Sequence, residues 1–164
     1  MQIADLVTPE RIACSVKVSS KKRAFELLAE LLSKNQQGLG QAEIMESLLA
    51  RERLGSTGLG HGVAIPHGRS KKLSRAIGAF VQLEKGIDFD AIDSQPVDLL
   101  FVLLVPEQCT DEHLQVLASL AEMLGDDLMR DKLHAAKSCE ELCGLMGAAV
   151  AQAPGIDAPR APHA

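Results

Sequence analysis

The sequence contains no tryptophan and no tyrosine, and only four phenylalanines stand among its 164 residues. Hydrophobic residues nevertheless make up 46% of the chain. The core must therefore be aliphatic, built from leucine, valine, isoleucine, alanine and methionine. A chain of this length can bury a sizeable core and is expected to fold as a single domain.

Two further absences concern membranes and nucleic acids. No apolar run approaches the length of a membrane span, and the N-terminus has no signal-peptide pattern. We therefore expect a cytoplasmic protein without membrane insertion. The formal net charge is −5 at pH 7, whereas a general nucleic-acid binder needs a basic surface to release counterions. Nucleic acid is not expected among the partners.

Cysteine is also scarce. Cys14, Cys109, Cys139 and Cys143 are scattered widely along a chain of ordinary size. This is not the dense spacing of a disulfide framework, and buried reduced thiols are the favoured interpretation. Cys139 and Cys143 share one helix face, where core packing is expected.

The first part of the chain predicts one strand and two helices. A mixture of β-branched and polar residues over 12–18 is typical of a strand. Ser20 can cap a helix that continues through about Ser33, and its cations at 21–23 are expected to form a solvated face. A second amphipathic helix follows and should end near Arg53.

Two more strands are predicted over 76–83 and 97–105, and Lys85–Gly86 is expected to turn the chain after the first of them. The second is almost uninterrupted apolar sequence, which is typical of a central strand covered on both faces. Strands interleaved with helices in this way give an α/β layer architecture.

Three helices are expected after the last strand. Thr110 can cap the first, a short helix covers 127–134, and the capping-box pair Ser138 and Glu141 opens a final helix to about residue 151. Alanine, proline, glycine and aspartate dominate from residue 152 onward, and this tail is predicted to be disordered.

The most informative stretch runs from Arg51 to Arg69. Glycines at positions 55, 58, 60 and 62 follow a helical pattern, and the apolar run 63–65 comes after them. Pro66 cannot donate to a sheet ladder and fits a strand end, and it leads directly into His67. The predicted result is an imidazole at the mouth of a strand, beside a glycine loop rich in backbone N–H donors. Such an imidazole can attack an electrophile or bind a ligand.

A nucleotide-binding loop and a metal site are two possibilities for this stretch. The glycines lack the Gly-x-x-x-x-Gly-Lys-Ser/Thr pattern. They also follow a helix and precede a strand, the reverse of the order that places phosphates on a helix N-terminus. His61, His67 and His113 could together hold zinc and leave an open position, but their spacing matches no zinc motif.

A phosphohistidine at His67 is the third possibility. A neutral imidazole attacks phosphorus readily, and phosphoryl transfer needs mainly positioning and positive charge. Arg51 and Arg53 lie just upstream, the loop's N–H groups can cradle phosphate oxygens, and His113 can reach the same sheet edge. Each of these residues also has an ordinary structural explanation, so their chemistry alone leaves the possibilities open.

The run Glu52, Leu59-Gly60 and Val63-Ala64-Ile65-Pro66-His67-Gly68 resembles the active-site signature of the type-2 (mannitol/fructose) IIA proteins of the bacterial phosphoenolpyruvate-dependent phosphotransferase system. Segments 55–60, 80–83, 89–93 and 95–106 further resemble the nitrogen-regulatory branch, IIA-Ntr. The resemblance covers nearly the whole chain except the tail. It implies a single EIIA type-2 domain over 1–151, with a mixed β-sheet flanked by helices on both faces, followed by the tail 152–164.

The resemblance also implies residue roles. His67 would accept a phosphoryl group on Nε2, as tele-phosphohistidine, from a histidine-phosphorylated HPr-like carrier, NPr. Arg51 and His113 would sit beside that phosphate, one neutralising charge and the other donating a hydrogen bond. Ser56 and Thr57 are weaker candidates for phosphate contact. No metal ion and no cofactor are expected.

A phosphotransferase of this kind is expected to act more as a regulator than as a metabolic enzyme. Phosphorylation adds roughly −1.5 to −2 charges to a site, and the resemblance implies that this state is signalled to nitrogen- or potassium-related proteins. One alternative is a free-standing IIA component of a fructose or mannitol permease, which passes phosphate to a IIB domain. Another is a docking module without phosphorylation, which the intact Pro66-His67-Gly68 disfavours.

Two further features of the sequence near His67 are an apolar rim and an unusual residue at position 61. An apolar rim of Leu54, Leu59 and Val63 is expected around His67, so that a carrier can dock and exclude water, although each residue could equally belong to the core. His61 departs from the residue expected in the family at this position, which is often asparagine.

Overall fold

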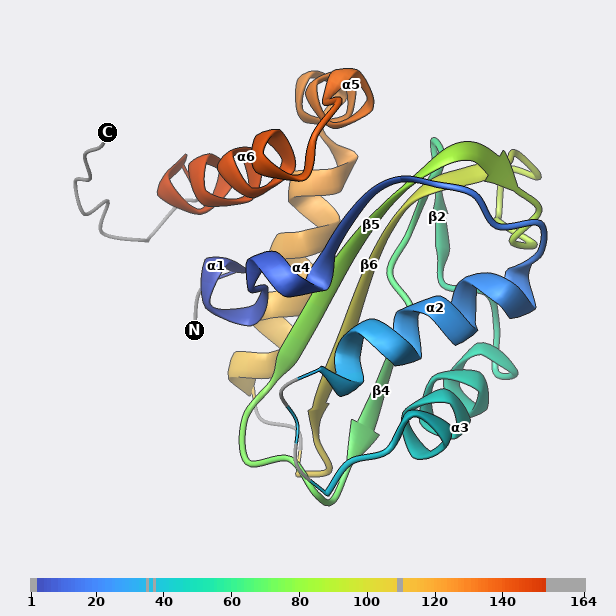
Figure 1. The fold of residues 1–164 in the computed structure, drawn as a ribbon, viewed down its shortest axis with the longest axis vertical. Helices are drawn as coiled ribbons and strands as arrows, with labels where there is room; N and C mark the ends of the chain where they lie inside the picture. The colour runs from blue at the N-terminus through green and yellow to red at the C-terminus, as the bar shows by residue number, and fades with distance from the viewer. Residues whose placement is uncertain (1–2, 35, 37, 109–110, 153–164) are drawn as a thin grey trace.

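The computed structural model describes residues 3–34, 36, 38–108 and 111–152, so the tail beyond residue 152 and the predicted cap Thr110 lie outside the described residues. Figure 1 shows a single sheet with helices on both faces. The strands are β1 (Ile12–Val16), β2 (Gly58–Gly60), β3 (Val63–Ala64), β4 (His67–Ser70), β5 (Ile77–Ile87) and β6 (Val97–Pro106). The helices are α1 (Ile3–Leu6), the 3-10 turn η1 (Pro9–Arg11), α2 (Lys21–Ser33), α3 (Gln41–Glu52), α4 (Asp111–Gly125), α5 (Asp127–Ala135) and α6 (Cys139–Gln152).

The sheet is mixed. Its strand order is β1-β5-β6-β3-β2, and β4 also pairs with β6. The pairs β1/β5, β3/β6 and β4/β6 are parallel, whereas β5/β6 and β2/β3 are antiparallel. Helices α2 and α3 pack on one face, and α1, α4, α5 and α6 pack on the other (Figure 1). The predicted mixed sheet with helices on both faces is confirmed.

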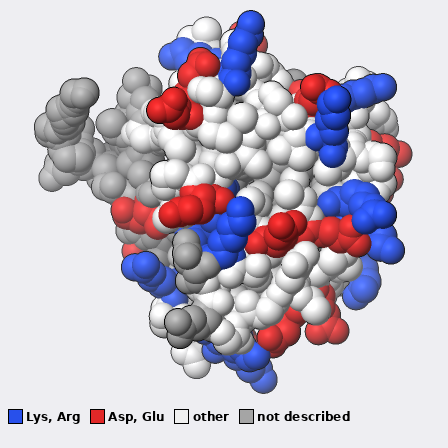
Figure 2. Space-filling view, in the orientation of Figure 1, with Lys and Arg blue, Asp and Glu red and all other residues white. Residues whose placement is uncertain are grey.

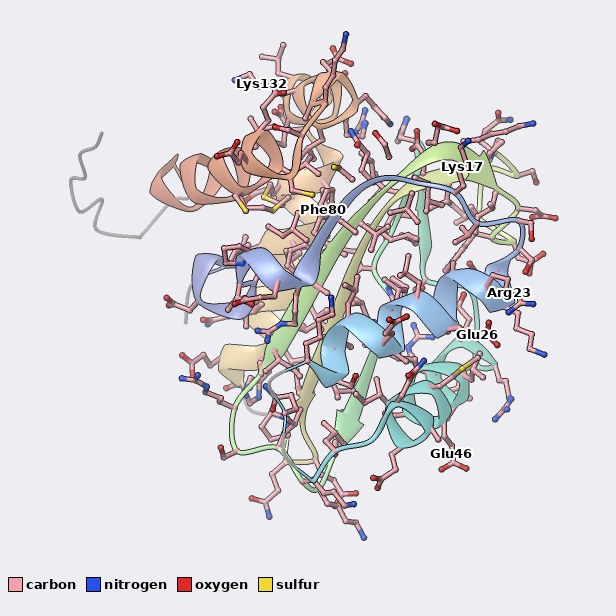
Figure 3. All side chains as sticks on the ribbon, viewed as in Figure 1. Lys17, Arg23, Glu26, Glu46, Phe80 and Lys132 are labelled. Atoms are coloured by element: carbon pink, nitrogen blue, oxygen red, sulfur yellow. The ribbon has the colours of Figure 1, made fainter. Side chains whose placement is uncertain are left out.

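Strand β6 is buried on both faces, as its apolar sequence predicted. Phe101 and Leu103 face the core under α4–α6, while Leu100 and Val102 face the core under α2 and α3. All four side chains are fully buried. Phe101 also packs against Phe80 of β5, with ring centroids 6.2 Å apart, and Figure 3 shows where Phe80 lies.

Two helix starts follow the capping signals in the sequence. Ser20 Oγ accepts a hydrogen bond from Arg23 N at 3.2 Å, and α2 ends at Ser33 as expected. Ser138 Oγ accepts from Glu141 N at 3.1 Å, which confirms the first half of the predicted capping box. The Glu141 carboxylate reaches one residue further back and accepts from Lys137 N at 3.1 Å.

The predicted turn at Lys85–Gly86 is wrong, because β5 continues to Ile87. A Cβ on Gly86 would lie only 2.7 Å from Cβ of Pro96. The glycine therefore permits close packing against the segment before β6. The chain reverses later, where Asp90 and Ser94 have positive φ angles of 55° and 59°.

The expectation of a solvated cationic face at 21–23 is wrong for Lys21. Its ammonium lies 2.9 Å from Glu52 Oε2 and 4.7 Å from the ring centroid of Phe89. Arg23 does face solvent, where it pairs with Glu26 of the same helix (Figure 3). Acidic and basic side chains are interspersed over the face in Figure 2. Across the described ranges, every helix is too short or too polar to cross a bilayer.

Candidate functional site

The glycine-rich stretch folds into a loop after α3 and then into the short strands β2 and β3. Three consecutive residues at its tip adopt positive φ angles: Gly60 at 96°, His61 at 58° and Gly62 at 82°. His61 N donates to Asp93 Oδ2 at 2.9 Å, which anchors the tip to the β5–β6 connection. Asparagine adopts this left-handed conformation more readily than most residues. This accounts for the asparagine expected at the position of His61.

Strands β3 and β4 together form one interrupted strand along β6. Val63 pairs with Leu99, and His67 pairs with Leu103, so the register is the same before and after the interruption. Pro66 lies in the gap and has no N–H, but its carbonyl accepts from Leu103 N at 3.0 Å. The prediction that the strand ends at Pro66 is therefore right only for β3, since His67 begins β4.

The imidazole of His67 is held by the interruption itself. Its Nδ1 lies 2.9 Å from the carbonyl oxygen of Ile65, two residues earlier. A carbonyl oxygen only accepts hydrogen bonds, so Nδ1 carries the proton. In the neutral ring the lone pair then resides on Nε2, which is the nitrogen available to a ligand or an electrophile.

The surroundings favour a neutral ring. The pKa of His67 is lowered from its ordinary value of 6.5, mainly because burial disfavours the imidazolium. The hydrogen bond to Ile65 acts in the opposite direction. Nearby Arg51 and Arg69 lower the pKa further, and Glu52 raises it. The net effect keeps the Nε2 lone pair free at neutral pH.

Glu52 organises the loop in a way that the sequence did not reveal. Its buried carboxylate accepts from Thr57 N at 3.1 Å and from Thr57 Oγ1 at 2.7 Å, and Lys21 compensates its charge at 2.9 Å. Thr57 O in turn accepts from Ile65 N at 3.1 Å. An ion pair from Lys21 to Glu52 therefore continues as hydrogen bonds through Thr57 and Ile65 to the ring of His67. Only the presence of Glu52 in the family signature could have signalled this role.

Ser56 and Thr57 lie in the loop, as the sequence implied, but protein groups already engage both hydroxyls. Ser56 Oγ donates to Phe89 O at 2.8 Å and accepts from Gly58 N at 3.1 Å. Thr57 Oγ1 donates to Glu52. In this arrangement both side chains brace the loop, and a contact between either hydroxyl and phosphate stays a prediction.

Arg51 belongs to the last turn of α3 and folds back over the loop. Its Nη1 donates to Gly55 O at 2.9 Å, which leaves the remaining guanidinium donors for other partners. Its charge acts on His67, as does that of Arg69 on β4. Arg69 was not among the sequence-predicted residues. Arg53 caps the end of α3 and is exposed.

His113 lies in the first turn of α4 and is buried. It lines a pocket with Lys71, Leu73, Ser74, Pro106, Glu107 and Gln108. Pro106 pairs with Ser70, the last residue of β4, whereas His67 is the first residue of β4. The structure thus brings His113 to the strand pair that carries His67, at the opposite end of β4.

A close approach of α3 to β4 explains the glycine after His67. A Cβ on Gly68 would lie 2.4 Å from Ser47 Oγ and 3.1 Å from the Ser47 backbone. Ser47 Oγ donates to Arg69 O at 2.7 Å and accepts from Arg69 N at 3.0 Å. Ser47 therefore pairs with the backbone N–H and carbonyl of Arg69 at the outer edge of β4. No local signal in the sequence indicates this role of Ser47.

Residues 5–147 match the protein family described as "Phosphoenolpyruvate-dependent sugar phosphotransferase system, EIIA 2". The chain belongs to this family. Membership implies a role in phosphotransfer, the chemistry that the neutral, oriented imidazole of His67 can perform.

Within this family, the chain is more similar to nitrogen-regulatory proteins than to a mannitol IIA protein. A nitrogen regulatory protein from Klebsiella oxytoca is 48% identical over 143 residues, which cover 87% of this chain and 88% of the relative. The crystal structure of the nitrogen regulatory protein IIA-Ntr from Neisseria meningitidis superimposes with a TM-score of 0.83 at 43% identity, covering 88% of this chain and 98% of that one. The crystal structure of IIA mannitol from Escherichia coli has a TM-score of 0.70 at 26% identity, covering 85% and 97%. The IIA-type fold and the resemblance to nitrogen-regulatory proteins are confirmed.

The expected apolar rim of this EIIA domain is only partly present. Leu54 is 84% exposed and Leu59 is 45% exposed, whereas Val63 is 1% exposed and belongs to the core. Val63 is buried because its side chain packs into the core on the face that α4–α6 cover. Ile92 is also exposed, but it lies at the tip of the loop, since its Cγ2 would lie 3.8 Å from a Cβ on Gly60.

The metal alternative finds no support among the residues that the structure describes. They contain no group of three histidine, cysteine, aspartate or glutamate side chains that could hold an ion. His61 is exposed at the tip of the loop, and His113 is buried near the far end of β4. Among the described residues, His61, His67 and His113 therefore do not form such a group.

Proposed function

We propose that this EIIA protein is a phosphocarrier that accepts a phosphoryl group on Nε2 of His67. The Nε2 lone pair attacks the phosphorus of a donor phosphohistidine. The new N–P bond forms as the donor's N–P bond breaks, and the donor imidazole recovers its lone pair.

The hydrogen bond from His67 Nδ1 to Ile65 O carries this proposal. It directs Nε2 away from the backbone and leaves that nitrogen unprotonated, as a nucleophile requires. The same bond persists after transfer, because the phosphorylated ring keeps its proton on Nδ1. The lowered pKa of His67 supports the proposal, since an imidazolium could not attack.

Positive charge near the ring supports phosphate stabilisation. Arg51 and Arg69 both act electrostatically on His67, and phosphoryl transfer depends on neutralising the equatorial oxygens. Backbone N–H groups of the glycine loop would add further donors. In this proposal His113, which lies beside the β4/β6 pair that carries His67, donates a hydrogen bond to the phosphate, as the family resemblance implies.

We further propose that the donor is a histidine-phosphorylated carrier of the NPr type and that the phosphorylation state is a regulatory signal. The nitrogen regulatory relative at 48% identity supports this assignment. The targets would be proteins of nitrogen or potassium control, approached through the rim residues Leu54 and Leu59, which are exposed. The added negative charge of the phosphate changes which partners can dock over that rim.

A sugar-permease IIA component is the second candidate, because the family description names a sugar phosphotransferase system and the IIA mannitol structure shares the fold. The identity to that protein is 26%, against 43% to IIA-Ntr from Neisseria meningitidis. The regulatory assignment is therefore the better supported one.

A phosphotransfer assay tests the proposal. The protein is incubated with phosphoenolpyruvate, Enzyme I-Ntr and NPr, beside His67→Ala and the loop control His61→Asn. We expect an acid-labile, base-stable phosphate on the wild type and on His61→Asn, and none on His67→Ala. An unlabelled wild type, or equal label on His67→Ala, would overturn the phosphocarrier assignment.

A second step separates the two candidates. The phosphorylated protein is mixed with a purified mannitol- or fructose-type IIB domain. Persistent phosphate on His67 is expected for a regulator. Rapid loss of the label to IIB would favour the permease component instead.

A further inference from the structure

Two cysteines far apart in the sequence meet on the face of the sheet opposite α2 and α3. The Sγ atoms of Cys14, on β1, and Cys139, the first residue of α6, lie 3.1 Å apart. Cys139 Sγ also lies 3.6 Å from Ile12 O. Figure 3 shows sulfur atoms, in yellow, gathered beneath α6. Cys14, Cys139 and Cys143 are free thiols, as predicted, but they are only partly buried, and the first two are direct neighbours. Cys109 lies outside the described residues.

Only a small movement of the two sulfur atoms is needed for a disulfide between Cys14 and Cys139. A disulfide has an S–S distance of about 2.05 Å, so the two sulfurs need to approach by roughly 1 Å. Both residues are anchored, since β1 pairs with β5 beside Cys14 and Ser138 caps α6 beside Cys139. Both side chains are also partly exposed, which gives a small oxidant access.

Cys143 provides a built-in comparison. It lies one turn further along α6 and is partly exposed like the other two. Within the described residues, its thiol makes no hydrogen bond to Cys14 or Cys139 of the kind that joins those two. Cys14 therefore pairs with the cysteine in the first turn of α6, Cys139, and not with Cys143 one turn later.

We propose that Cys14 and Cys139 form a reversible disulfide when the protein meets a hydroperoxide. One thiolate attacks the peroxide O–O bond and becomes a sulfenic acid, while the leaving oxygen takes up a proton as water or an alcohol. The second sulfur then attacks the sulfenic sulfur and expels water. In total, two thiols lose two electrons and two protons, and the peroxide is reduced.

The chemistry of the thiols sets the conditions for this reaction. The hydrogen bond to Cys139, burial, and the nearby Cys139 sulfur raise the pKa of Cys14. Since the thiolate is the nucleophile, oxidation is expected to be slow at neutral pH and faster as the pH rises. A dithiol reductant should reopen the bond.

The bridge would join α6 to the edge strand β1 and close a long segment of chain. That segment contains the other strands of the sheet and His67. Cross-linking so much of the chain restricts the unfolded state, so the oxidised protein should be more stable than the reduced one. The inference is independent of the proposed phosphotransfer.

The experiment uses the full chain, fully reduced and then exposed to hydrogen peroxide at pH 8, with intact mass and non-reducing peptide mapping as readouts. Wild type and Cys143→Ser should lose two hydrogen atoms per molecule and yield a peptide linking Cys14 to Cys139. Cys14→Ser and Cys139→Ser should gain oxygen only. The wild-type Tm should rise on the order of 5–15 °C on oxidation and return with dithiothreitol.

Three outcomes would overturn the proposal. One is oxygen addition to the wild type without loss of hydrogen. Another is a bridge that uses Cys109 or Cys143 in place of either named residue. The third is a bridge between two molecules, which non-reducing electrophoresis would reveal.

Discussion

Two neighbouring strands run through the middle of this protein and differ in continuity. Strand β6 spans ten residues without interruption, and its side chains fill the cores on both faces. The strand beside it is divided into β3 and β4 at Ile65 and Pro66, although both parts keep one register with β6.

The interruption is what makes a site possible. In a continuous strand the backbone carbonyls are used by the ladder, whereas Ile65 O accepts from the His67 ring. His67, which is only partly buried, can then keep a hydrogen bond to the backbone and still be reached by a partner. Stability is concentrated in β6, and the chemistry lies in the gap of its neighbour.

The largest effect should come from breaking β6. Replacing Phe101 with alanine removes a fully buried ring that touches Phe80 and is expected to cost about 3–5 kcal/mol of unfolding free energy. Urea unfolding followed by circular dichroism measures it. The exposed Leu128→Ala on α5 serves as the control and should change little. Equal effects of the two substitutions would contradict the comparison.

Gly68→Ala tests the packing of the interrupted strand. The new Cβ would lie 2.4 Å from Ser47 Oγ and 3.1 Å from the Ser47 backbone, and we expect a loss of about 3 kcal/mol, the upper end for overpacking. Gly144→Ala on α6 is the matched control, because its Cβ would meet nothing within 4 Å. It should be neutral or stabilising. Urea midpoints that fall together would be evidence against a close α3–β4 approach.

Glu52→Gln tests the hydrogen bonds that lead to His67. The amide keeps the shape but loses the charge that Lys21 and Thr57 use, and each charge-assisted hydrogen bond is worth about 1.5–3 kcal/mol. We expect lower stability together with a slower initial rate of phosphorylation. Glu43→Gln, whose partner Lys72 is exposed, is the control. A normal rate with Glu52→Gln would mean that the network holds the fold but not the ring.

The pH dependence of phosphorylation tests whether the His67 ring is neutral at the pH where it reacts. Since burial, Arg51 and Arg69 lower the pKa of His67 from 6.5, the rate should stay high at pH 6.5 and fall only at lower pH. Arg51→Met should move the acid limb toward higher pH, whereas Arg53→Met should not. The stability of the fold should also decrease as the pH falls, because the unfolded chain binds the proton on His67 more readily than the folded protein does. The neutral His67 ring therefore makes its full contribution to the free energy of unfolding above pH 6.5, and this contribution is lost as the pH falls below that value.

The smallest effect is expected at the tip of the loop. His61 has a φ of 58°, and asparagine adopts this conformation more readily, so His61→Asn should add up to about 1 kcal/mol of stability. Differential scanning calorimetry would detect the higher Tm. The label on His67 should be unchanged. A lower Tm would show that the imidazole makes a contact that outweighs backbone preference.

Much of the fold could be predicted because its signals are local. The apolar run of β6, the cap Ser20 and the pair Ser138 and Glu141 each indicate an element from a few neighbouring residues, and all three appear in the structure. The family signature around His67 is equally continuous in the sequence. Proline and glycine were less reliable guides. Gly86 allows packing against Pro96 where a turn was predicted.

The supporting residues of the site could not be predicted, because they come from distant parts of the chain. Lys21 reaches Glu52 from the start of α2, and Ser47 reaches Arg69 from α3. Whether an apolar residue forms the rim or the core is decided in the same way. Val63 is buried in the core under α4–α6, while Leu54 stays exposed.

The sequence by itself determined the long helices and strands, the aliphatic core and the position of the histidine that follows Pro66, since periodicity, capping and family motifs are properties of adjacent residues. The short elements α1, β2 and β4 were not predicted. Only the tertiary structure decided which nitrogen of His67 is free, which charges surround it, and that Cys14 meets Cys139. These depend on contacts across the sheet, where the distance between two atoms is set by packing and not by their separation in the chain.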